Sequence, residues 1–259
     1  MKKVFILLTV LFMAYSVQTK AQDVINKILK EKTLVVGTTG EQFPFTFKNT
    51  NGKLNGIDIN IANALAKKLG VEAKFEVMPF DKLIEALKEG KIDIILSGMS
   101  ITTKRNTQVA FPGVYYKTGK SILTFKKELY KGEVKAINKK EVKLAATENT
   151  TSEKYVKANY PNATLITVKD ITEAKKMLLA GKVDGVVADY ETTEMLAFGI
   201  TEKSVYYKNI SKPTEKEFIS PAVSAKDFLF INLVSNFIER VNAYDDDAAV
   251  ENLWIKYLN

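Results

Sequence analysis

The stretch EALKEGKIDIILSG, from Glu85 to Gly98, decides how this sequence folds. Its first half has apolar residues at helical spacing and ends at Gly90, and its second half is an apolar run around Asp93, which is typical of a buried strand. A second stretch of the same build, KMLLAGKVDGVVAD, runs from Lys176 to Asp189. This internal echo predicts two α/β units of similar design.

Around each stretch, short apolar runs alternate with amphipathic segments, the pattern of a mainly parallel sheet flanked by helices. In the first unit we expect strands at 33–39, 73–78 and 91–96, with helices at 58–70 and 80–90. In the second unit we expect strands at 143–148, 164–168 and 182–189, with helices at 150–159 and 170–181. Two C-terminal helices, at 226–244 and 247–258, are expected to pack on the first unit, with Trp254 in its core.

The N-terminus has the features of a secretory signal peptide. MKK is a basic start, Val4–Val17 is an apolar run, and small residues Thr19 and Ala21 precede a polar stretch. The apolar run is too short to span a bilayer, so we expect cleavage after residue 21 and a mature chain that begins near Gln22. An uncleaved membrane anchor is the alternative.

Two residue types are absent, and their absence limits the chemistry. The 259-residue chain contains no cysteine and no histidine. We therefore expect no disulfide, no lipid anchor on a cysteine, no metal site built on histidine and no Ser–His or Cys–His catalysis. The formal net charge of +8 is spread along the chain without interleaved aromatic residues, which argues against nucleic-acid binding.

The ends of the two echoed strands predict a binding site. The first strand runs into SGMSITTKR, Ser97–Arg105, where small hydroxyl residues precede an arginine in the first turn of an expected helix. The second strand ends at Asp189. Ligands bind outside the carboxyl ends of strands in open parallel sheets, so Arg105 and Asp189 are predicted to hold the carboxylate and the ammonium of a zwitterion. A surface salt bridge at Arg105 and a helix N-cap at Asp189 are the alternatives.

Several segments, in order along the chain, give the sequence its resemblance to a known family. It resembles the periplasmic solute-binding proteins of family 3, the polar amino acid type that feeds ABC importers. The segments that carry the resemblance are LVVGTT, FPFTF (Phe43–Phe47), NGKLNGIDINIANALAKKLG, GKIDIILSGMSITTKR, VAFPGVYYKTG (Val109–Gly119), GKVDGVVAD and ENLWIKYL (Glu251–Leu258).

The resemblance implies roles for individual residues. Arg105 stands where the family's arginine holds the ligand carboxylate, and Asp189 stands where a carboxylate pairs with the ligand ammonium. The other positions that the resemblance places at the ligand are Ser100, Gly98, Ser97, Thr151, Thr150, Phe80, Gln42 and Thr39.

Four positions depart from the family's pattern, and at one of them Ile57 stands where the common G-F-D element has an aromatic residue. Gln42-Phe43 occupies a region where many relatives have an aromatic residue, and Asn149 belongs to a segment that lacks the family's usual glycine. Thr39 stands where binders of basic amino acids often have an acid, which argues against a Lys, Arg or His ligand. The side chain of the ligand stays open.

The resemblance implies a two-lobed fold of the type II periplasmic binding proteins, with two crossover strands as a hinge. Lobe 1 is expected at 22–120 and 218–259, and lobe 2 at 121–217. The implied function is that of a monomeric periplasmic receptor that closes over an amino acid or similar zwitterion and delivers it to the membrane permease of an ABC importer, without cofactor or metal.

Two other functions on the same fold remain alternatives. Cyclohexadienyl dehydratases have elements similar to Thr38–Gly40 and Gly56–Asp58, and Lys120 also has a counterpart there. Those enzymes need a catalytic glutamate, and in this register the position is Thr192, with Glu191 one residue away. A sensor or regulatory module is the other alternative.

Overall fold

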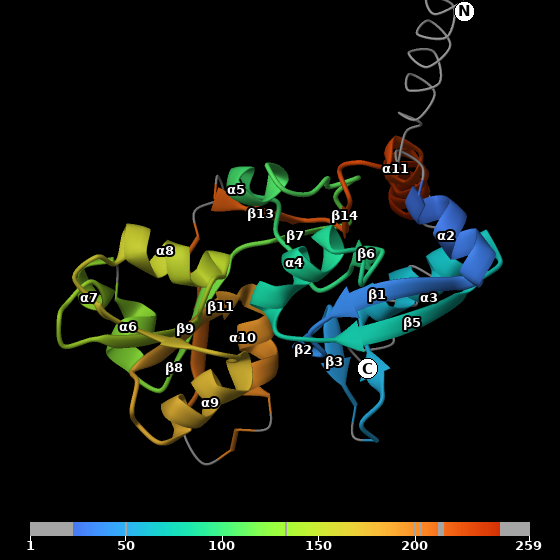
Figure 1. Cartoon of the computed structure of the whole chain (residues 1–259). Helices are drawn as coiled ribbons and strands as arrows, with labels where there is room; N and C mark the ends of the chain where they lie inside the picture. Colours follow the sequence, from blue (N-terminus) through green and yellow to red (C-terminus); the bar gives the residue numbers. More distant parts are fainter. Residues whose placement is uncertain are drawn as a thin grey trace, which may run out of the picture.

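The protein is an α/β molecule with two separate sheets, each in its own lobe. The computed structural model describes residues 23–49, 51–132, 134–198, 200–201, 204–211 and 215–243. The expected signal peptide, the expected helix at 247–258 and Trp254 lie outside these residues. Figure 1 shows the two lobes side by side. Lobe 1 is the part built around the first sheet, and lobe 2 the part built around the second.

The first sheet has four strands in the order β14-β6-β1-β5, and its pairs are parallel except at β14. Its strands are β1 (Thr33–Thr38), β5 (Glu72–Val77), β6 (Ile94–Ile95) and β14 (Ala222–Val223). A small sheet, β2-β3-β4, extends from the end of β1. It is built from β2 (Glu41–Gln42), β3 (Thr46–Lys48) and β4 (Leu54–Asn55). Asn51-Gly52 lies in the hairpin between β3 and β4, and Asn55-Gly56 leads from β4 into α3 (Ile57–Leu69).

Helices cover both faces of the first sheet because its buried strands are apolar on both sides. One face packs against α2, α3 and α11, with Leu34 and Val36 of β1 in that core. The other face packs against α4, where Ile95 and Leu83 belong to one buried cluster. The helical segments of lobe 1 are α2 (Asp23–Glu31), α3 (Ile57–Leu69), η2 (Phe80–Lys82), α4 (Leu83–Lys88), α5 (Thr103–Asn106) and α11 (Phe228–Ala243).

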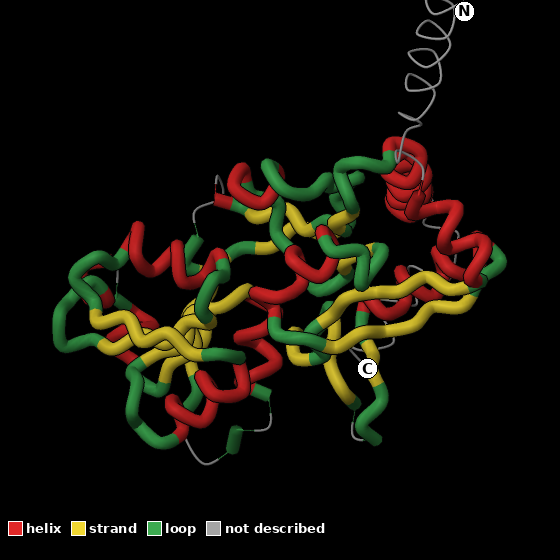
Figure 2. Tube along the Cα trace, in the orientation of Figure 1, coloured by secondary structure: helices red, strands yellow, loops and turns green. Residues whose placement is uncertain are grey.

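The second sheet repeats this plan with five strands in the order β10-β9-β11-β8-β12. Its strands are β8 (Lys120–Thr124), β9 (Lys143–Thr147), β10 (Thr164–Val168), β11 (Gly185–Asp189) and β12 (Tyr206–Asn209). β9, β10 and β11 are parallel, whereas β8 and β12 add antiparallel pairs. The helices are α6 (Lys127–Lys131), α7 (Val134–Ile137), α8 (Thr151–Asn159), α9 (Ile171–Leu179) and α10 (Tyr190–Ala197). Figure 2 shows how helix and strand alternate along both lobes.

Two short strands connect the lobes. β7 (Tyr116–Thr118) leads from lobe 1 into lobe 2, and β13 (Glu217–Ile219) leads back, and the two pair antiparallel. Figure 1 shows this pair running between the lobes. Lys120, which we expected as the last residue of lobe 1, begins β8 instead, because its backbone pairs with Asp189 in the second sheet.

The strand expected at 91–96 is shorter than its apolar run. β6 covers Ile94–Ile95 only. Just before it, the carboxylate of Asp93 accepts a hydrogen bond from the backbone N–H of Val35 at 2.9 Å and pairs with Lys27 at 3.0 Å. The side chain of Asp93 thus makes one of the contacts to β1 that strand pairing would otherwise make. Within the described residues, no helix is long and apolar enough to cross a membrane.

Candidate functional site: an interlobe cavity with an arginine and a buried charge network

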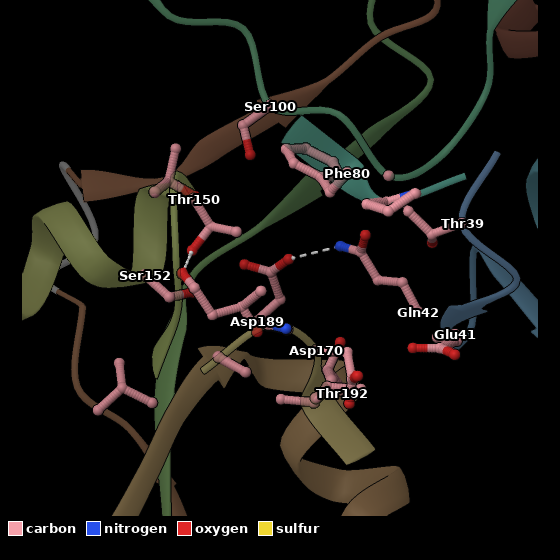
Figure 3. A pocket seen from close by; sticks show the side chains of 18 of the residues that line it. Thr39, Glu41, Gln42, Phe80, Ser100, Thr150, Ser152, Asp170, Asp189 and Thr192 are labelled. Carbon is pink, nitrogen blue, oxygen red and sulfur yellow. Dashed lines mark hydrogen bonds between the residues drawn. The ribbon is translucent and has the colours of Figure 1, made fainter. Parts of the chain in front are cut away.

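A cavity of about 410 Å³ lies between the lobes. Figure 3 shows side chains of both lobes pointing into it, among them Ser100 and Phe80 from lobe 1 and Asp189 from lobe 2. The residues that line this interlobe cavity are Thr39, Glu41, Gln42, Val77, Met78, Pro79, Phe80, Gly98, Ser100, Arg105, Lys120, Thr147, Thr150, Thr151, Ser152, Lys169, Asp170, Ile171, Val187, Ala188, Asp189 and Thr192.

Gly98 lets the chain turn into the cavity where β6 ends. Its φ of +56° lies in the left-handed region, and a Cβ there would come within 2.8 Å of Gln42 Nε2. The Gly98 N–H donates to Asp58 Oδ2 at 2.6 Å, and the Tyr115 hydroxyl donates to Asp58 Oδ1 at 2.5 Å. Burial raises the pKa of Asp58 to about 6, although both hydrogen bonds oppose that shift. A buried carboxylate of lobe 1 therefore fixes the backbone that forms this wall of the cavity.

Arg105 presents a buried guanidinium to the cavity. Thr102 caps α5 by accepting a hydrogen bond from Arg105 N at 3.2 Å. The guanidinium donates to the Ser100 carbonyl at 2.9 Å and lies 5.0 Å from the centre of the Phe80 ring. Among the described residues it forms no ion pair, so a surface salt bridge is not its role here. Burial lowers the pKa of Arg105, against the opposing fields of Glu217 and Asp189. An anion in the cavity would satisfy this cation.

Asp189 faces the cavity from lobe 2. It occupies the N-cap position of α10 but makes no side-chain cap hydrogen bond. Its carboxylate accepts from Lys120 Nζ through one oxygen and from Gln42 Nε2 at 3.2 Å through the other, a contact that Figure 3 shows crossing the cavity. Burial raises the pKa of Asp189, and Lys120 opposes this effect.

Lys120 and Glu217 complete a buried network that the sequence did not predict. Lys120 is 1 % exposed and pairs with Asp189 and, at 3.0 Å, with Glu217 Oε1. The other Glu217 oxygen, Oε2, accepts from Ser100 Oγ at 2.5 Å and from Thr151 Oγ1 at 2.8 Å. Glu217 begins the crossing strand β13 and Lys120 follows the crossing strand β7, so both reach the site because those strands pass beside it. The sequence provides one indication of this network, because Lys120 has a counterpart in the cyclohexadienyl dehydratases.

The structure brings together nearly all the residues that the sequence placed at the ligand. Nine of the ten predicted residues line the interlobe cavity, and Ser97 does not. Ser97 lies just behind the wall, where its hydroxyl accepts from Thr39 N at 3.1 Å and contacts the Thr39 hydroxyl at 3.2 Å. Asn149 takes the left-handed backbone conformation, with a φ of +60°, in the segment where the family's glycine is missing.

Two other acids of the cavity wall, Glu41 and Asp170, were not predicted. Glu41 lies in lobe 1 and Asp170 caps α9 in lobe 2. Burial and the nearby charge of Asp170 raise the pKa of Glu41. Neither residue lies at a strand end of the echoed pattern, so the reasoning that found Asp189 could not find them.

The arrangement does not place a general acid where the dehydratase alternative needs one. Thr192 stands at the relevant position, and its hydroxyl donates to the Phe43 carbonyl at 3.0 Å. Glu191 is absent from the cavity lining and instead accepts from Tyr116 at 2.7 Å and from Thr118 at 2.6 Å. In the part of the chain that the structure describes, no group of three or more acidic residues could hold a metal ion.

Comparisons with known proteins agree with this geometry. The family model of the bacterial extracellular solute-binding proteins, family 3, matches residues 34–243. The chain is 34 % identical to the L-arginine-binding protein of Pseudomonas aeruginosa over 191 residues, which cover 73 % of this chain and 70 % of that protein. It is 32 % identical to the glutamine-binding protein of Geobacillus stearothermophilus over 209 residues, 79 % of this chain and 78 % of the relative.

A solved structure has the same overall fold. An ancestral amino acid-binding protein, described as a precursor of cyclohexadienyl dehydratase, superposes with a TM-score of 0.79 at 32 % identity and covers 91 % of this chain and 99 % of its own. The family and these relatives are binding proteins, and the dehydratase alternative is not favoured. From its two-lobed fold, its interlobe cavity and the match over 34–243, the chain belongs to family 3 of the bacterial extracellular solute-binding proteins.

Proposed function

We propose that this protein captures an α-amino acid between its lobes and presents it to an ABC importer. The observation that carries the proposal is the interlobe cavity, to which lobe 1 contributes the buried Arg105 guanidinium and lobe 2 the Asp189 carboxylate. A guanidinium can hold a carboxylate through two parallel hydrogen bonds, and a buried carboxylate pairs well with an ammonium group. One zwitterion can pair its carboxylate with Arg105 and its ammonium group with Asp189.

The ligand is enclosed by closure of the two lobes about the β7–β13 pair. The division of the chain expected from the sequence, 22–120 with 218–259 and 121–217, is supported by this pair, because the lobe 2 ends of the two strands, Thr118 and Glu217, lie close to its boundaries. Two short strands are a natural hinge because few backbone torsions need to change for the lobes to rotate as rigid bodies.

The protein acts outside the cytoplasm as a monomer, after cleavage of the signal peptide and without a lipid anchor. The family description, which names extracellular solute-binding proteins, supports this location. Its partner is the membrane permease of an ABC importer, which recognises the closed form.

The charge of the cavity wall bears on the ligand's side chain. The expectation against a basic ligand depended on Thr39, but Glu41 and Asp170 add negative charge to the cavity wall. Basic amino acids therefore belong in the screen beside neutral ones.

A thermal-shift screen of the twenty L-amino acids tests the proposal. A ligand that binds only the folded state stabilises it by about 4 kcal/mol at a thousandfold excess over Kd. We expect one amino acid, or a small group of them, to raise Tm and isothermal titration to give a single site. Absence of any shift with all twenty would refute amino acid binding.

A further inference from the structure

One stretch of lobe 2 holds most of the protein's excess of positive charge. The stretch 126–143 contains seven lysines and three glutamates, a net charge of +4. The whole chain carries +8, and cleavage of the expected signal peptide removes Lys2, Lys3 and Lys20, which leaves +5. Outside this stretch, acidic and basic residues of the secreted chain therefore nearly balance.

The fold places this stretch at the outer end of lobe 2. Figure 1 shows α6 and α7 on the side of lobe 2 that lies away from lobe 1. Leu129 of α6 and Ile137 of α7 are buried in the same core cluster, so the lysines of both helices face solvent. Lys143 begins β9, whereas Thr147, at the other end of that strand, lines the interlobe cavity. The charged surface and the cavity thus lie at opposite ends of the parallel strands.

Most of these lysines have no carboxylate partner. Lys126 pairs with Asp184 at 2.7 Å. The other six are exposed and form no ion pair within the described part of the chain. We call these six the basic tip: Lys127, Lys131, Lys135, Lys139, Lys140 and Lys143. Their charges are therefore available to an anionic partner.

Two exposed side chains with apolar surface lie among the lysines. Val134 is 55 % exposed, and Tyr130 is 39 % exposed and stacks on Tyr206 with 5.2 Å between ring centroids. Clustered lysines attract a layer of anionic headgroups without needing a pocket, and tyrosine and apolar side chains enter that layer. The stretch contains no arginine, whose planar fork suits the recognition of single phosphates and nucleic acids. The chemistry of this surface fits a lipid bilayer best.

We propose that the basic tip, together with Tyr130 and Val134, binds the surface of membranes that contain anionic phospholipids. The contact is peripheral: the ammonium groups lie beside headgroup phosphates, and the two other side chains enter the headgroup layer. The cavity remains accessible to its ligand, because no residue of the stretch 126–143 lines it. The inference does not depend on which molecule the cavity binds.

Flotation with lipid vesicles tests this surface. The chain is used from Gln22 onward, so that the apolar run of the signal peptide takes no part. We expect binding to vesicles with about 30 % phosphatidylglycerol, little binding to pure phosphatidylcholine, and release from the anionic vesicles at about 0.5 M salt, where screening is strong. The variant Lys131→Gln, Lys135→Gln, Lys139→Gln, Lys140→Gln should bind the anionic vesicles roughly tenfold more weakly or less.

A matched variant separates the position of the charge from its amount. Lys53→Gln, Lys67→Gln, Lys68→Gln, Lys88→Gln removes four exposed lysines of lobe 1, and it should weaken vesicle binding by less than about twofold. Equal losses in the two variants would overturn the inference, and so would equal binding of the unchanged protein to both kinds of vesicle. Binding to a DNA duplex but not to vesicles would also overturn it. The assay contains no amino acid, so its result is independent of whether the proposed function holds.

Discussion

At Arg105, burial lowers the pKa of the guanidinium, whereas the charges of Glu217 and Asp189 raise it. The guanidinium is 7 % exposed, and apart from its bond to the Ser100 carbonyl its donors are directed to no carboxylate within ion-pair distance among the described residues. A charge in this state costs free energy until an anion arrives. We therefore expect the position to serve binding rather than stability.

Arg105→Ala is expected to abolish binding and to leave the empty protein's Tm nearly unchanged. Two charge-assisted hydrogen bonds, at about 1.5–3 kcal/mol each, correspond to more than a hundredfold in affinity. Titration calorimetry with the amino acid found in the screen measures the loss, and Lys104→Ala, at the exposed neighbouring position, is the control. Retention of the parent affinity would mean that the carboxylate is held elsewhere.

Asp58 makes the stability of the folded protein fall as the pH rises. Its pKa is raised from 3.8 to about 6 in the folded protein, so the folded state binds this proton more tightly than the unfolded chain does. Stability from Asp58 is therefore fully present below about pH 4, and it is lost as the pH rises through about 6. The loss amounts to about 3 kcal/mol at 1.36 kcal/mol per unit of pKa.

Urea unfolding of the wild type and of Asp58→Asn between pH 4 and 7.5 measures this contribution. We expect the wild type to gain stability relative to the variant as the pH falls from 7 to 4. The comparison removes the titration of all other groups, which the two proteins share. A difference in the free energy of unfolding that stays constant over this range would contradict the buried, protonatable state of Asp58.

Among the elements, α2 and α11 share one capping residue. Asp227 Oδ2 accepts from the N–H groups of Val24 and Ile25 at 3.1 and 3.2 Å, and Oδ1 accepts from Phe230 N at 2.9 Å. One carboxylate thus satisfies the first turns of two helices that are about two hundred residues apart in sequence.

Asp227→Ala is expected to cost about 2–4 kcal/mol of the free energy of unfolding, because it leaves three backbone donors without their acceptor. Ligand affinity should not change, since Asp227 does not line the interlobe cavity. Chemical denaturation gives the first quantity and calorimetry the second, with exposed Lys226→Ala as the control. A loss below about 0.5 kcal/mol would mean that water replaces the carboxylate at no cost.

The elements also show what sequence reasoning could and could not predict. The parallel strands and flanking helices of both sheets follow from local periodicity, whereas the antiparallel strands β8, β12 and β14 were not predicted. Arg105 and Asp189 follow from the rule that strand ends carry the site. Lys120 and Glu217 could not be found in this way. Their partners lie in other elements, and the contacts depend on how two strands cross between lobes.

In the whole molecule, hydrogen bonds join the two lobes directly. Gln42 reaches Asp189 at 3.2 Å, and Thr192 reaches the Phe43 carbonyl at 3.0 Å. The Gln42 amide occupies the face of Asp189 that our proposal gives to the ligand's ammonium, so ligand and Gln42 compete for one oxygen.

Gln42→Ala is expected to open the ligand-free protein. Small-angle X-ray scattering should give a larger radius of gyration for this variant without ligand, and Gln42→Ala with Thr192→Val should increase it further. At saturating ligand the variants and the wild type should agree, because the ligand supplies new interlobe contacts. Lys48→Ala, on the lobe 1 hairpin, is the control. Identical ligand-free scattering for all proteins would show that these two bonds do not hold the lobes together.

Lobe 1 is assembled from both ends of the described chain: α2, β1 and β5 come early, whereas β14 and α11 follow the whole of lobe 2. A ribosome therefore releases every strand of the second sheet before it has made the last strand of the first. Lobe 2 can therefore fold while lobe 1 still lacks its edge strand β14 and its helix α11. Truncation before residue 220 should leave lobe 2 folded and lobe 1 incompletely folded. We expect proteases to cleave the incomplete lobe 1 before lobe 2.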